Sequence, residues 1–251
     1  MLSARSWSGR GGALRTKAKE RVVGLGNGGS RKNFCKSRNR ILILTAHPDD
    51  ECMFLSPAVI SLCKQNEIFV LCATTGDYYK KGAVRQTELI EGCKILGVPE
   101  ANVEILDNSA FPDDPHAVWD LVNLGGHVRK IINKFKPTYV FTFDDIGITG
   151  HPNHISVSVM SRQLAQAKGF SHGEVKFFEL ESVSLPRKYI SFLDLPFNMG
   201  SNHLTFVLSV TDILRAQRAM CAHRSQMVWF RALYIIFSRY MVINTFCEVP
   251  T

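Results

Sequence analysis

Residues 47–51, HPDDE, place one imidazole and three carboxylates directly after the apolar run ILILT (41–45). His47 and Asp50 are three positions apart, a spacing that can aim both side chains at one point where a chain turns into a helix. Imidazole nitrogens and carboxylate oxygens bind zinc, and a spare carboxylate beside a metal can serve as a general base. The alternative is that Asp49 or Asp50 caps a helix, which leaves the other Asp and His47 without a role.

A second polar cluster, GHPNH (150–154), also follows an apolar run and opens a helical pattern. A pair such as His151 and His154 is by itself more often incidental than a metal site. Two such clusters are a stronger signal, because they meet if the strands before them are neighbours. Two His and one carboxylate suit catalytic zinc, which lowers the pKa of bound water toward about 7. The remaining carboxylate and imidazole would supply a general base and a donor for the oxyanion or the leaving amine.

Short apolar runs alternate with helical patterns along the body of the chain. They predict strands at 41–45, 68–75, 103–106, 138–143, 175–182 and 203–209, with helices at 51–65, 84–96, 117–135 and 211–240. This alternation predicts right-handed βαβ units, and so an α/β, Rossmann-like fold with a mainly parallel sheet and helices on both faces. We expect the metal site at the carboxyl ends of the strands, where the two clusters meet if 41–45 and 138–143 lie side by side.

The positive charge of the chain lies in its first forty residues. The net charge is +8, but residues 1–40 hold 11 Lys and Arg and one acid, whereas 41–251 hold 19 basic and 21 acidic residues. The body therefore has no basic excess for nucleic acid, and no such partner is expected. We expect 1–40 to be a basic disordered tail, with a mitochondrial transit peptide as the alternative. Seven Cys without a CxxC pair indicate free thiols in a reducing compartment.

With both clusters in view, the chain resembles the LmbE-like de-N-acetylase family. AHPDDE (46–51) and GHPNH (150–154) match that family's signatures in the same order, and RQTEL (85–89) and AHRSQ (222–226) agree further. The resemblance extends over essentially all of 41–251, which is therefore expected to form an LmbE-like deacetylase domain. Three further segments resemble the eukaryotic members that act on N-acetylglucosaminyl-phosphatidylinositol: FPDDP (111–115), LPRKYISFLDLP (185–196) and WFRALYIIFSRYM (229–241).

The resemblance implies a role for each polar residue of the two motifs. The expected ligands of Zn²⁺, or of another divalent metal, are His47, Asp50 and His154. Asp49 would be the general base, and His151 would stabilise the oxyanion or protonate the departing amine.

For three further residues near the motifs, the sequence allows more than one role. Arg85 and Asp107 would hold sugar hydroxyls, although Arg85 could equally pair with Glu88 on a helix surface and Asp107 could equally belong to a turn. Glu51 would orient a ligand or favour a helix N-terminus.

The resemblance also implies a zinc-dependent hydrolase that removes the acetyl group from N-acetylglucosaminyl-phosphatidylinositol, the second step of glycosylphosphatidylinositol (GPI) anchor synthesis. Its expected place is the cytoplasmic face of the endoplasmic reticulum membrane. A basic tail stands where these enzymes begin with a hydrophobic anchor, so cytosolic and mitochondrial locations remain alternatives. The apolar stretch 228–243 could touch a membrane surface or form an ordinary buried helix. The functional alternatives are a soluble deacetylase of small N-acetyl sugar conjugates and a catalytically silent subunit.

Overall fold

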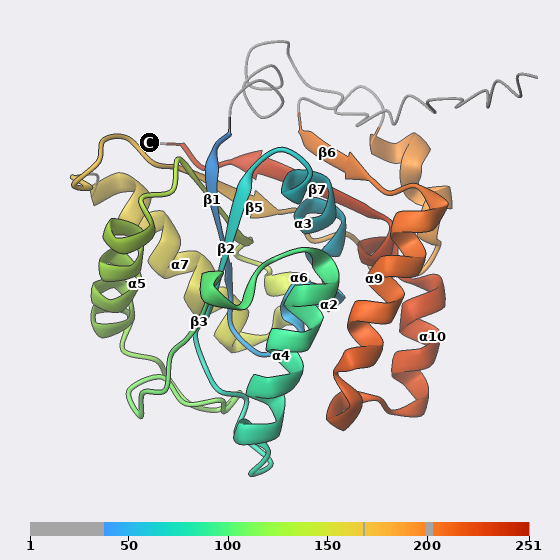
Figure 1. Ribbon diagram of the computed structural model, residues 1–251, viewed down its shortest axis with the longest axis horizontal. Helices are drawn as coiled ribbons and strands as arrows, with labels where there is room; N and C mark the ends of the chain where they lie inside the picture. Colours follow the sequence, from blue (N-terminus) through green and yellow to red (C-terminus); the bar gives the residue numbers. More distant parts are fainter. Residues whose placement is uncertain (1–37, 168, 199–202, 251) are drawn as a thin grey trace, which may run out of the picture.

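The computed structural model describes residues 38–167, 169–198 and 203–250, and within them seven strands form one mixed sheet (Figure 1). Apolar residues that are buried on both faces build the central strands, as a sheet covered on both sides requires. From one edge to the other the strands are β3 (Val103–Ile105), β2 (Glu67–Cys72), β1 (Arg40–Thr45), β4 (Tyr139–Phe143), β5 (Lys176–Leu180), β7 (Ile243–Glu248) and β6 (Leu204–Val207).

Five neighbouring strands, β3 to β5 in the sheet order, run parallel. Strands 41–45 and 138–143 are neighbours, as the meeting of the two clusters requires, because Ile41 pairs with Tyr139 and Ile43 with Phe141. β1 contributes four completely buried aliphatic side chains, Ile41 to Leu44, to the core. The α/β architecture with a mainly parallel sheet is therefore as the sequence predicts, and the segments after β1 and β4 leave the sheet at the same edge.

Helices cover both faces of the sheet: α5 and α7 lie on one side, and α3, α4, α9 and α10 on the other (Figure 1). The longer helices are α3 (Ser56–Cys63), α4 (Gly82–Leu96), α5 (Leu121–Phe135), α7 (Pro152–Ala167), α9 (Val210–Ala222) and α10 (Trp229–Phe237). The shorter ones are α2 (Asp50–Met53), α6 (Gly147–Gly150), α8 (Leu185–Lys188), η1 (Glu100–Asn102), η2 (Ser191–Asn198), η3 (Arg224–Gln226) and η4 (Arg239–Met241).

Side chains and one glycine define several helix ends. Asp120 caps α5 by accepting from the backbone N–H groups of Val122 and Asn123. Gly97 ends α4 in the left-handed conformation, at φ 98°, as its position after the helical pattern predicts.

Two helices predicted as continuous are divided in the structure. The 51–65 segment splits into α2 and α3, with Pro57 in the first turn of α3, because proline cannot continue the hydrogen bonding of the preceding turn. The 211–240 segment splits into α9 and α10, joined by η3. Residues at both breaks, Phe54 and Gln226, line the cavity that also contains the polar clusters.

The C-terminal strand β7 was not predicted. It runs antiparallel to β5 on one side and to β6 on the other. No helix among the described residues is long and apolar enough to span a bilayer. The predicted disordered tail, residues 1–40, lies outside the described part of the chain except for its last three residues.

Candidate active site

The two motifs meet at the carboxyl ends of β1 and β4. Their side chains line one cavity of about 250 Å³ with contributions from His47, Asp49, Asp50, His151 and His154. The three imidazole rings lie close together: the ring centroids of His47 and His151 are 4.8 Å apart, and those of His151 and His154 are also 4.8 Å apart. The adjacency of two parallel strands thus brings together residues about one hundred positions apart in the sequence.

Asp50 is held by the backbone that precedes it. Its Oδ2 accepts from the N–H groups of Ala46 and His47, at 3.0 and 2.8 Å, while its Oδ1 lies 3.2 Å from His154 Nε2. Burial favours the neutral acid, but the two neighbouring imidazoles and the backbone donor keep the pKa of Asp50 below its ordinary value. Asp50 therefore remains an anion, and its Oδ1 faces His154 instead of the backbone. Neither Asp50 nor Asp49 caps α2 with its side chain, so the capping alternative is wrong.

His154 presents one nitrogen to the cavity. Its Nδ1 lies 3.2 Å from the Gly147 carbonyl, which can only accept, so Nδ1 carries the proton. The ring stacks on Phe143 at a centroid distance of 4.1 Å. Its Nε2 is buried, makes no well-formed hydrogen bond and lies 3.2 Å from Asp50 Oδ1. In a metal-binding histidine, one ring nitrogen donates to a group such as a carbonyl and the other faces the metal. His154 has this arrangement.

His47 completes a donor set that fits a divalent metal. Burial lowers the pKa of His47 to about 3, which keeps the ring neutral and its lone pair available. One nitrogen from each of His47, His151 and His154 lies within 4.8 Å of the others. The nitrogens of His47 and His154 and the Oδ1 atom of Asp50 are the kinds of ligand found in catalytic zinc sites. The cluster is therefore a possible metal-binding group.

Asp49 has a strained backbone and a carboxylate directed at the cavity. Its φ of 120° is rare for a residue with a Cβ and marks local strain of the kind found at functional sites. The Oδ2 atom is buried without a hydrogen bond, although Arg231 Nη2 lies 3.2 Å away and Arg85 Nη2 lies 3.6 Å from Oδ1. Burial outweighs both guanidinium groups and raises the pKa of Asp49. A carboxylate with a raised pKa is suited to accept a proton.

A buried ion pair supports the backbone of Asp49. The Asp49 N–H donates to Glu51 Oε2 at 3.1 Å, and the other oxygen of Glu51 lies 2.7 Å from His223 Nε2. Glu51 and His223 are both completely buried. Helix α4 passes so close that a Cβ at Gly92 would lie 2.9 Å from His223 Nε2. Glu51 therefore connects the end of α9 to the strained residue in the cavity.

Arg85 lines the cavity and does not lie on an exposed helix surface. It donates to the Pro48 carbonyl at 2.6 Å and to the Gly76 carbonyl at 3.2 Å, and it lies 3.3 Å from Asp113 Oδ2. Glu88 instead accepts from the N–H and hydroxyl of Ser225, so the alternative of an Arg85–Glu88 surface pair is wrong.

Asp107 is exposed after β3 and is not among the residues that line the cavity. A carboxylate six positions later, Asp113, lines it instead, and its Oδ1 lies 3.2 Å from His47 Nε2.

Three contributors to the site had no assigned role at the sequence level: Asp113, Arg231 and His223. Each one lies in a segment that carries the family resemblance, FPDDP, WFRALYIIFSRYM or AHRSQ. No spacing rule links these segments to the two motifs, because their contacts bridge distant parts of the chain. The resemblance was the only signal that could have marked them.

Comparisons with known proteins agree on one family. A family model described as GlcNAc-PI de-N-acetylase, PIG-L, matches residues 42–165. The N-acetylglucosaminyl-phosphatidylinositol de-N-acetylase of Bos taurus is 41% identical over 225 residues, which cover 89% of this chain and 85% of that protein. A probable enzyme of the same name from Schizosaccharomyces pombe is 35% identical, with 81% and 84% covered.

Solved structures show the same fold at low sequence identity. The N,N'-diacetylchitobiose deacetylase from Pyrococcus horikoshii is similar with a TM-score of 0.61 and 18% identity, over 86% of this chain and 85% of that one. A deacetylase from the biosynthesis pathway of teicoplanin has a TM-score of 0.59 and 15% identity, over 83% and 98%. The relatives confirm the resemblance carried by the two motifs: the chain belongs to the GlcNAc-PI de-N-acetylase (PIG-L) family.

Proposed function

We propose that this chain is a metal-dependent amide hydrolase that removes the acetyl group from N-acetylglucosaminyl-phosphatidylinositol in GPI-anchor biosynthesis. The observation that supports it most is the meeting of both motifs in one cavity, where Asp49 lies beside the donors of His47, Asp50 and His154. The family membership and the name of the Bos taurus relative support the choice of substrate.

His47, Asp50 and His154 would hold the metal, with zinc as our first choice. A divalent cation bound there would polarise the acetyl carbonyl and lower the pKa of water. The neutral ring of His47 and the anionic carboxylate of Asp50 are already in the protonation states that a metal needs. Asp113, 3.2 Å from His47 Nε2, would keep that ring oriented.

Asp49 and His151 would divide the proton transfers. Asp49 takes a proton from the attacking water, a new C–O bond forms at the acetyl carbon, and the C–N bond breaks to release acetate and the free amine of the sugar. His151 Nδ1 accepts from the Asn153 N–H at 3.3 Å, so the proton of its neutral ring is on Nε2. That proton can stabilise the oxyanion or pass to the leaving amine.

Sugar recognition would fall to Arg85, whose side chain lines the cavity together with Asp113. Asp107 remains a prediction for the same role, at an exposed position after β3. The substrate carries lipid chains, so we place the protein at the cytoplasmic face of the endoplasmic reticulum membrane.

Acetate release from N-acetylglucosaminyl-phosphatidylinositol tests the proposal. The full chain is stripped of metal and assayed before and after addition of zinc and other divalent cations. We expect metal-dependent release, and a loss of roughly 10²–10⁴-fold in Asp49→Asn, because that change removes the proton acceptor. Asp145→Asn is the matched control, since Asp145 also follows β4 but forms an exposed ion pair with Arg162.

Two results would contradict the proposal. One is equal release by Asp49→Asn and the control, which would remove Asp49 from the mechanism. The other is a wild-type chain that folds, binds one metal ion in elemental analysis and releases no acetate, which would reject the substrate.

A further inference from the structure

Helix α10 is apolar on nearly all its sides, yet most of it faces outward. Only Tyr234 and Ile235 are buried against the body. The exposed apolar residues of this helix are Trp229, Phe230, Leu233, Ile236 and Phe237. A helix that buries two positions and exposes five large apolar ones has a face without a partner among the described residues.

The neighbouring α8–η2 segment repeats this character. Its exposed apolar residues are Leu185, Tyr189, Phe192, Leu193 and Phe197. The two segments are in contact through the rings of Tyr189 and Tyr234, whose centroids are 6.4 Å apart. We call these ten exposed residues of α10 and α8–η2 the aromatic rim. Exposed apolar residues gathered on adjacent elements mark interaction surfaces, whereas isolated ones need no explanation.

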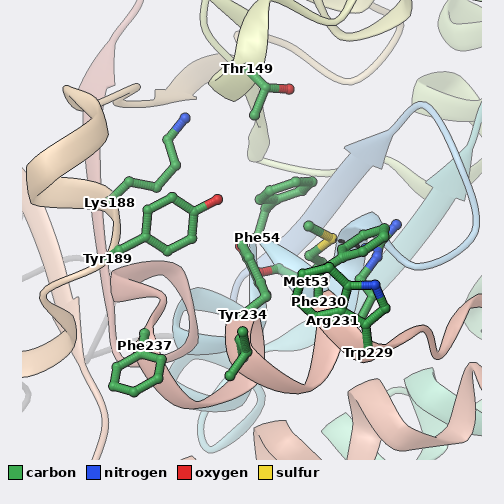
Figure 2. A pocket seen from close by; sticks show the side chains of 11 residues that line it. Met53, Phe54, Thr149, Lys188, Tyr189, Trp229, Phe230, Arg231, Tyr234 and Phe237 are labelled. Carbon is green, nitrogen blue, oxygen red and sulfur yellow. Dashed lines mark hydrogen bonds between the residues drawn. The ribbon is translucent and has the colours of Figure 1, made fainter.

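A cavity of about 510 Å³ opens between the two parts of the aromatic rim (Figure 2). Tyr189 and Lys188 lie on one side of it, and Phe237, Tyr234 and Trp229 on the other. Most of its lining is aromatic or aliphatic.

The cavity adjoins the catalytic one. Met53, Phe54, Thr149 and Arg231 line both cavities. A ligand with a polar end beside Asp49 could therefore extend its apolar end into this second space.

The charged residues around the aromatic rim are buried or paired. Asp194 is paired with Arg187 at 2.7 Å and with Arg239 at 2.9 Å. Lys188 is buried and donates to the Ile148 carbonyl, and Arg231 lies 3.2 Å from Asp49. The exposed part of the rim is therefore apolar, with the Trp and Tyr side chains that are enriched at the level of phospholipid headgroups.

Building on the proposed function, we propose that the aromatic rim docks on a phospholipid bilayer and that the apolar cavity receives the lipid end of the glycolipid. The acyl chains then remain in or near the bilayer, while the sugar lies beside Asp49 in the adjoining cavity. The exposed Trp229 and Tyr189 side chains and the position of the apolar cavity beside the one that would hold the sugar of a lipid substrate favour a bilayer over a protein partner or a second copy.

Vesicle binding of the full chain tests the docking surface without using catalysis. The vesicles contain phosphatidylcholine alone, and the buffer contains high salt, because the basic residues 1–40 would otherwise bind anionic lipid. The docking variant is Phe192→Ser combined with Trp229→Ser, at positions 66% and 77% exposed. The control variant is Val118→Ser combined with Val122→Ser, at positions 96% and 85% exposed at the start of α5. We expect the docking variant to bind about tenfold more weakly and the control to bind like the wild type.

Fluorescence locates the contact. Lipids brominated in their acyl chains quench tryptophan emission at close range, so we expect them to quench the wild type and to lose most of this effect in Trp229→Phe. Trp119 is buried and gives no such signal, and the measurement is made in a Trp7→Phe background so that Trp229 is the tryptophan that reports.

Equal binding by the docking and control variants, or no binding by the wild type, would overturn the docking proposal. So would a dimer in solution that the docking variant abolishes, because the rim would then belong to a second copy. Acetate release from a substrate analogue without acyl chains is measured in parallel. Release without vesicle binding rejects the docking surface alone, and vesicle binding without release from either substrate rejects the proposed function alone.

Discussion

The catalytic cavity and the apolar cavity share a wall but are stabilised in different ways. In the first, ionisable groups are fixed by directional contacts: two backbone N–H groups hold Asp50, and the Gly147 carbonyl holds His154. In the second, rings from α10 and the segment after α8 surround an open space. In a site for proton transfer, each polar atom must be held in position by a neighbouring group. A site for apolar chains mainly needs sufficient volume and an apolar lining.

The largest effect on stability is expected at the shared wall. Phe54 is buried and makes edge contacts with the rings of Phe143, His154, Tyr234 and Tyr240, at centroid distances of 5.7 to 6.1 Å. Phe54→Ala should lower the free energy of unfolding by about 3–5 kcal/mol, because it leaves a cavity among these rings. Urea denaturation measures this, with Phe54→Leu as the milder control. A similar small loss in both variants would show that the two cavities do not depend on a common packed wall.

The next effect should come from the ion pair behind Asp49. His223→Ala leaves the buried carboxylate of Glu51 without its partner, which should cost about 3 kcal/mol in the free energy of unfolding. Since Glu51 also accepts from the Asp49 N–H, kcat should fall while KM changes little.

His223→Gln is the matched variant, because its amide N–H can still donate to Glu51. If the Glu51–His223 pair is purely structural, His223→Ala should be less stable than the wild type but keep its kcat. If the pair positions Asp49, His223→Ala should lose both stability and kcat, and His223→Gln should recover part of each.

A smaller effect is expected from the carboxylate behind His47. Asp113→Asn should weaken metal binding by roughly 10–100-fold, as removal of a group that orients a metal ligand usually does. Competition with a coloured chelator measures the affinity. Asp114→Asn is the control, since the Asp114 side chain accepts from the His116 N–H. Unchanged affinity in Asp113→Asn would mean that His47 is oriented by other neighbours.

The smallest effect should be found on the far side of the apolar cavity. Phe237 is half-exposed, so Phe237→Ala should change the free energy of unfolding by no more than about 0.5 kcal/mol. The same urea experiment applies. A loss comparable to that of Phe54→Ala would show that α10 is packed as firmly as the shared wall, and would contradict the contrast between the two cavities.

The sequence predicted the parts of the fold that depend on local pattern. The apolar runs marked β1 and β4, and the glycine after α4 marked the end of that helix. Once these two strands are neighbours, His47 and His154 meet at the carboxyl ends of β1 and β4. Such inferences succeed because burial on both faces of a parallel sheet leaves a continuous apolar signal.

The parts that were missed depend on distant partners. The 211–240 segment reads as one helix, yet after α9 the buried contact of His223 with Glu51 and the hydrogen bonds of Ser225 to Glu88 accompany a break. β7 contains Asn244 and Thr245, both buried, so its apolar pattern is weak. Asn244 is satisfied by the Ala58 N–H and the Phe54 carbonyl, which lie far away in the sequence. A single sequence does not show which distant residues form such hydrogen bonds.

The position of β7 between β5 and β6 has a consequence for biosynthesis. β6 (Leu204–Val207) finds its sheet partner only in β7, which is translated about forty residues later. The five parallel strands and both polar motifs are complete by residue 180, whereas β6 has no partner strand until β7 has been made. The segments that form the aromatic rim, α8–η2 and α10, also follow residue 180. Assembly of the catalytic motifs should therefore precede assembly of the surface that we assign to lipid.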